Sequence, residues 1–171
     1  FTFSHRYNDK KIVINKIENY EQLLEDNFVI LDRNKRSNKI INDTSYILDK
    51  EKLKLVNDES LLEEVVGLVE FPNVLIGSIR KQFMKLPREV LSTAMRVHQK
   101  YFSIIDEEKN LVSKFLFVAN SVKNKNRDFR VIEGNERVLK ARLSDASYFF
   151  EKDISNTFEN WNEKLKHVMF Y

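Results

Sequence analysis

The stretch Tyr101–Ala119, with the sequence YFSIIDEEKNLVSKFLFVA, decides the fold class of this 171-residue chain. Two runs rich in aromatic and β-branched residues, 101–105 and 111–119, flank the five polar residues 106–110. This pattern is typical of two antiparallel strands joined by a short loop. We therefore predict a β-hairpin, and with it a sheet, in the second half of the chain.

Most of the remaining sequence has the spacing of apolar residues that favours helices. Before the hairpin we expect a strand at 11–14, helices at about 19–41 and within 46–56, a helix capped by Ser60, a buried strand at 74–76 and a helix that begins at Pro87. After it we expect a helix at about 129–152 and a last helix capped by Asn156. This order predicts an α+β fold with helices on a small, mostly antiparallel sheet. We expect one domain over residues 1–171, with a possible boundary near residue 57.

Several large side chains fall on the apolar stripes of these predicted helices and are expected in the core. They are Val97, Val138, Phe149, Phe150, Trp161 and, in the last helix, Val168. This position on a stripe makes core packing a better interpretation of the aromatic residues than base stacking.

Composition excludes several classes of protein. The chain has no cysteine, which removes disulfides and thiolate metal sites and fits a reducing compartment such as the cytoplasm. No stretch is long and apolar enough to span a membrane, and the start lacks the apolar core of a signal peptide. Because the first residue is not methionine, we expect a piece of a longer protein.

Charge is unevenly distributed along the chain. Residues 80–142 hold 15 Lys or Arg against 7 Asp or Glu, a net charge of +8, whereas the rest holds 14 against 19. Two interpretations stay open. The basic segment is either a solvated surface or an electropositive face for a polyanion such as RNA.

No residue pattern predicts a self-contained catalytic centre. The three glycines are too scattered for a phosphate-binding loop. The histidines His5, His98 and His167 lack metal-ligand spacing, and the carboxylates Glu70 and Asp145 are not paired for acid–base chemistry.

Five ordered blocks nevertheless resemble one family, the β subunit of bacterial glycyl-tRNA synthetase. The blocks are LLEEV with LVEFP at 61–72, LPREVL with HQKYF at 86–102, FVAN at 117–120, GNERVL with ARL, DA and FF at 134–150, and HRY at 5–7, where Ser4 replaces the glycine of the family. They extend over essentially the whole chain, so the chain is similar to the N-terminal region of that subunit.

The resemblance implies a role within a larger enzyme. The family forms an α/β heterotetramer that joins glycine to its tRNA with ATP and Mg²⁺, which the α subunit binds, so no cofactor is expected in this region. The expected partners are the α subunit, glycine tRNA and the remaining β-subunit domains, in the cytoplasm and without a membrane. The fold is expected to resemble the B3/B4-type module of phenylalanyl-tRNA synthetase β subunits.

Three hypotheses follow for this region. It could engage tRNA through phosphate contacts, for which the candidates are Arg96, Gln99, Lys100, Arg137, Lys140 and Arg142. It could instead be a scaffold for the α subunit or other β domains, for which the candidates are Glu70, Asn135, Glu136 and Asp145. A vestigial editing domain is the third alternative.

Overall fold

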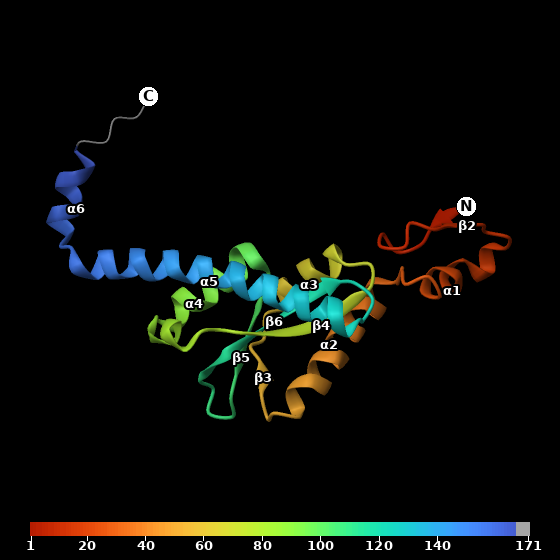
Figure 1. Ribbon diagram of the computed structural model, residues 1–171, viewed down its shortest axis with the longest axis horizontal. Coiled ribbons are helices and arrows are strands. Elements are labelled where there is room, and N and C mark those ends of the chain that lie inside the picture. Colours follow the sequence, from red (N-terminus) through yellow and green to blue (C-terminus); the bar gives the residue numbers. More distant parts are fainter. Residues whose placement is uncertain (167–171) are drawn as a thin grey trace.

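The computed structural model describes residues 1–166 of the chain, which form an α+β fold (Figure 1). Its elements are β1 (Thr2–Phe3), β2 (Lys11–Ile12), the 3₁₀ helix η1 (Ile17–Asn19), α1 (Tyr20–Glu25), α2 (Arg33–Asp49), β3 (Lys54–Leu55), α3 (Glu59–Leu68), β4 (Pro72–Ser78), the 3₁₀ helix η2 (Lys81–Lys85), α4 (Arg88–Gln99), β5 (Phe102–Ile105), β6 (Leu111–Asn120), α5 (Lys125–Ser155) and α6 (Phe158–Leu165). The predicted fold class is thereby confirmed.

The main sheet has four antiparallel strands in the order β3-β5-β6-β4. The predicted hairpin is confirmed as β5 and β6, with an irregularity in the register between Ser103 and Ile105. β4 is longer than predicted and pairs with β6 from Pro72 to Ser78. A Cβ atom at Gly77 of β4 would lie 2.5 Å from the ring of Phe115 on β6, so only glycine fits at this position.

Helices cover both faces of this sheet because its central strands are apolar on both sides. Leu75 of β4 and the neighbouring aromatic side chains of β6 pack against α4 and α5, where Leu139 and Leu143 are buried. On the opposite face, Val74 and Leu116 pack against α2 and α3. The molecule therefore has three layers, and Figure 1 shows α5 running along one of them.

The predicted helix over 19–41 is wrong, because two helices occupy this segment. α1 ends at Glu25, Phe28 has a left-handed backbone with φ of 62°, and the backbone N–H of Ile30 donates to the carbonyl of Glu70. Asp32 then caps α2 by accepting from two backbone N–H groups. α2 continues to Asp49, so the segment predicted at 46–56 contains the end of a helix and then β3.

Several predicted boundaries also shift by one to four residues. The side chain of Asp58, rather than Ser60, caps α3, and Pro87 is the residue before α4 rather than its first residue. α5 begins at Lys125, and at the start of α6 the hydroxyl of Thr157, rather than Asn156, accepts from a backbone N–H.

Three residues expected in the core are exposed instead. Val97 and Val138 are each 44% exposed and Phe149 is 63% exposed. Phe150 and Trp161 are half-buried. Val168 and His167 lie outside the described residues. For Phe149 the cause is the path of α5, whose last part extends away from the sheet and leads to α6 at one end of the molecule (Figure 1).

Candidate nucleic-acid interface

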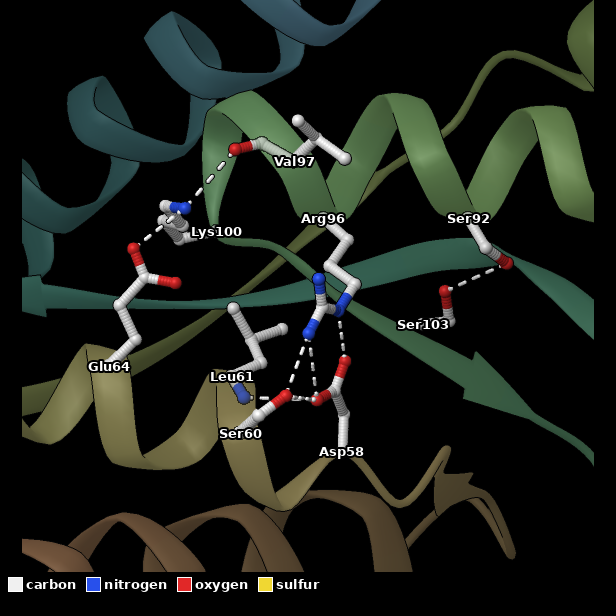
Figure 2. A network of polar contacts seen from close by, with 9 residues as sticks. All are labelled: Asp58, Ser60, Leu61, Glu64, Ser92, Arg96, Val97, Lys100 and Ser103. Atoms are coloured by element: carbon white, nitrogen blue, oxygen red, sulfur yellow. Dashed lines mark hydrogen bonds and ion pairs between the residues drawn. The ribbon is translucent and has the colours of Figure 1, made fainter.

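Arg96 is bound to an acidic partner from another helix. Its Nε atom lies 2.5 Å from Oδ2 of Asp58, and one Nη atom donates to the hydroxyl of Ser60 at 2.7 Å, as Figure 2 shows. Hydrogen bonds from Arg96 first, and then from the backbone N–H of Leu61, lower the pKa of the Asp58 carboxyl to about 2. The guanidinium is therefore neutralised within the protein.

Lys100 follows the same pattern at the end of α4. Its backbone is left-handed, with φ of 57°, and its Nζ atom lies 2.7 Å from Oε1 of Glu64 on α3. The same ammonium donates to the carbonyl of Val97 (Figure 2). Gln99 is half-buried beside it. Because α3 and α4 cover opposite faces of the sheet, these contacts join the two helical layers.

Two basic side chains of α5 lie in a groove and, unlike Arg96 and Lys100, are not closely paired with a carboxylate. Arg137 and Lys140 line a groove of about 470 Å³ between α5 and η2, and Arg80 lies on the other side of it. Arg137 is 77% exposed, and Glu133, at 3.9 Å, is the only carboxylate within 4.0 Å of it in the described chain. Within residues 1–166, Arg80 and Lys140 have no carboxylate within 4.0 Å. Sequence reasoning missed Arg80, although it lies at the start of the basic segment.

Arg142 does not belong to this groove. It follows Lys140 by two residues, which in an α-helix is a rotation of about 200°. The side chain is exposed on another side of α5, so the sequence-predicted cluster is divided between two faces.

Asn135 and Glu136 attach α5 to the sheet. The carbonyl of the Asn135 side chain accepts from the hydroxyl of Tyr101 at 2.5 Å, and the Glu136 carboxylate accepts from the backbone N–H of Ser78 at 2.7 Å. Burial raises the pKa of the Tyr101 hydroxyl to about 12, so it stays a donor. Asp145, by contrast, is exposed on α5.

A buried polar cluster, which sequence reasoning did not identify, connects the N-terminal segment to the sheet. Oδ1 of Asn120 accepts from Nε2 of His5 and from the backbone N–H groups of Glu70 and Phe71, at 2.9–3.0 Å. His5 is fully buried, and the half-exposed carboxylate of Glu70 lies 3.9 Å from its Nε2 atom. The three segments are far apart in sequence, and their only shared signal is that each lies in a block of the family resemblance.

The described part of the chain offers no alternative site for a metal ion or a membrane. No three His, Asp or Glu side chains among residues 1–166 are placed to hold a metal ion. No helix in the same range combines the length and the apolar composition needed to cross a bilayer.

Comparison with known proteins identifies the same family as the sequence blocks described above. The family described as glycyl-tRNA synthetase beta subunit matches residues 1–171. The chain belongs to this family. It is 44% identical to the glycine–tRNA ligase beta subunit of Rickettsia felis over 99% of its length, and 45% identical to that of Rickettsia bellii, strain OSU 85-389. It covers 26% of each of these relatives, so the chain spans about a quarter of the length of the β subunits it matches.

Proposed function

We propose that this chain is a non-catalytic region of the β subunit of a glycine–tRNA ligase, where it engages tRNA and contributes to assembly. In this proposal the complete enzyme attaches glycine to its tRNA in the cytoplasm, and the α subunit binds ATP and Mg²⁺. The names of the relatives support the ligase.

The observation that carries the RNA part of the proposal is the groove between α5 and η2. Arg80 and Lys140 line it without a carboxylate partner in the described chain, and Arg137 is held only loosely. Exposed, unpaired Lys and Arg side chains are the groups that contact backbone phosphates. Glu133 and Glu136 also line the groove, but the Glu136 carboxylate is engaged by the sheet.

Four of the six RNA candidates differ in whether a carboxylate of the chain already binds them. Arg96 and Lys100 are engaged with carboxylates of α3, so they serve the internal organisation of the protein in this proposal. Arg137 and Lys140 remain the phosphate-contact candidates, and Arg80 joins them. Asn135 and Glu136 hold α5 in the position that forms one wall of the groove.

The test is the affinity of the α/β holoenzyme for labelled glycine tRNA, measured by fluorescence anisotropy at several salt concentrations. The test variant is the double charge reversal of Arg137→Glu and Lys140→Glu. The control is Lys50→Glu with Lys54→Glu, which changes net charge equally but lies at the end of α2 and in β3. The slope of log affinity against log salt is negative, and loss of two phosphate contacts makes it shallower by about 1.8.

A slope change of this size also has a direct readout. The affinity for tRNA falls when the salt concentration rises from 50 to 200 mM. The factor by which it falls should be about 12-fold smaller in the test variant than in the wild type. The control variant keeps the wild-type slope. If both double variants behave alike, the groove does not contact tRNA and the region acts as a scaffold only.

A further inference from the structure

One apolar stripe extends along α5 and continues after the body of the protein has ended. Leu139 and Leu143 are 1% and 0% exposed, where the helix packs on the sheet. The spacing of three and four residues continues through Ala146 and Phe150 to Ile154, so all five side chains lie on the same side of the helix. Ala146 and Phe150 are half-buried, whereas Ile154 is 69% exposed.

A groove between α4 and α5 lies next to the half-buried part of this stripe. It has a volume of about 440 Å³, and its lining residues are Glu89, Val90, Thr93, Ala94, Val97, His98 and Ala146. Most of these side chains are apolar or small. A groove between two packed helices is the shape that accepts the ridge of a third helix.

The residues that line the groove indicate which kind of molecule could bind there. No Lys or Arg lines the groove, so it lacks the cations that RNA phosphates require. Burying an isoleucine or phenylalanine side chain contributes about 1.5–3 kcal/mol, so an apolar partner would stabilise the complex. The groove therefore fits an amphipathic protein helix.

We propose that this groove and the exposed end of the stripe, at Ile154, bind a helix from the rest of the same β-subunit polypeptide. The stripe is continuous with the core residues Leu139 and Leu143, which favours a partner that belongs to the same folded chain. The relatives are about four times as long as this chain, so most of such a polypeptide is covalently attached to this region. A tether raises the effective concentration of the partner helix without a second molecule.

The inference deepens the assembly part of the proposed function and rests on it, because it requires the chain to work inside a longer β subunit. It does not depend on contact with RNA. The two ideas can therefore fail separately.

The experiment measures thiol accessibility in the full-length β subunit, alone and in the α/β holoenzyme. The test variant is Ile154→Cys, and the matched control is Lys152→Cys, two residues away and so on the opposite side of α5. Both native side chains are exposed in the described structure, and the 171 residues contain no cysteine of their own. Maleimide labelling of the peptide that carries the new thiol is followed by mass spectrometry and divided by its rate in denaturant.

We expect the thiol of Ile154→Cys to react about tenfold or more slowly than that of Lys152→Cys in the β subunit alone, because a docked helix must open first. Equal rates in the β subunit and in the holoenzyme would overturn the inference. Slow labelling that appears only after the α subunit is added would also overturn it, because the partner would then be another chain.

A second cysteine position keeps the test valid if the Ile154→Cys variant does not fold. Val97→Cys lies in the groove itself, where the native side chain is 44% exposed, and should be slow in the β subunit alone as well. Its tRNA affinity is measured in parallel. Slow labelling supports the inference whatever the RNA result, and fast labelling at both positions refutes it even if tRNA binds normally.

Discussion

Removing the charge of Asp58 without removing its hydrogen-bonding capacity separates two roles of this residue. Asp58 pairs with Arg96 and also caps α3 through the backbone N–H of Leu61. Asparagine is as good a cap as aspartate, so Asp58→Asn should remove only the ion pair. Asp58→Ala should remove both contributions.

The pKa of Asp58 sets the magnitude. A decrease from 3.8 in the unfolded chain to about 2 in the folded protein corresponds to about 2 kcal/mol. The side chain of Arg96 is 48% exposed, so solvent screening reduces the expected cost of Asp58→Asn to about 1 kcal/mol at neutral pH. Asp58→Ala should cost about 1 kcal/mol more, through the lost cap.

The pH dependence has a defined sign. Because the folded pKa is the lower one, the stabilisation is fully present above pH 3.8 and is lost as the pH falls toward about 2. At about pH 2.5 roughly a third of it should remain. Urea unfolding followed by circular dichroism measures the difference between wild type and Asp58→Asn at each pH.

The exposed pair of Arg33 and Glu63 provides the control. Its side chains are 50% and 64% exposed, so Glu63→Gln should cost no more than about 0.5 kcal/mol. A wild-type advantage over Asp58→Asn that stays constant from neutral pH to about pH 2.5 would refute the reasoning. Equal costs of Asp58→Asn and Asp58→Ala would refute the separate contribution of the cap.

Three further outcomes are expected of the folded chain. Gly77→Ala should lower the free energy of unfolding by about 1–3 kcal/mol, because the new methyl group meets the ring of Phe115, and Phe115→Leu in the same chain should restore part of it. Asn120→Ala should cost about 2–4 kcal/mol in urea unfolding, because the buried Nε2 atom of His5 loses its acceptor along with two backbone donors. In an absorbance titration of tyrosine ionisation, Tyr101→Phe should remove a component near pH 12 and leave the rest of the titration unchanged; a wild-type titration without such a component would contradict the burial argument.

The sequence correctly predicted those helices and strands whose formation depends on residues close together in the chain. The hairpin at 101–119 and the apolar spacing of α3, α4 and α5 could be identified because each side chain's position follows from the period of its own element. The single helix expected over 19–41 failed for a non-local reason. Ile30 hydrogen-bonds to Glu70, 40 residues further along the chain, and no pattern within the segment contains that contact.

The same distinction between local and non-local information applies to the candidate site. The basic clusters were visible in the sequence, but whether a cation is free depends on residues from other elements. Arg96 is neutralised by Asp58, which lies 38 positions away, whereas Lys140 has no such partner in the described chain. Arg142 was grouped with Lys140 by proximity in sequence, although a separation of two residues places it on another side of a helix.

The three-layer arrangement has a consequence for the synthesis of this protein on the ribosome. α2 and α3 are complete by Leu68, but the strand that receives their apolar side chains includes Leu116. At translation rates of about 5–20 residues per second, the roughly 50 intervening residues take about 2–10 s to appear. During that interval Val65 and Val66 have no sheet to cover them, so the nascent chain offers an apolar segment to chaperones until the hairpin emerges.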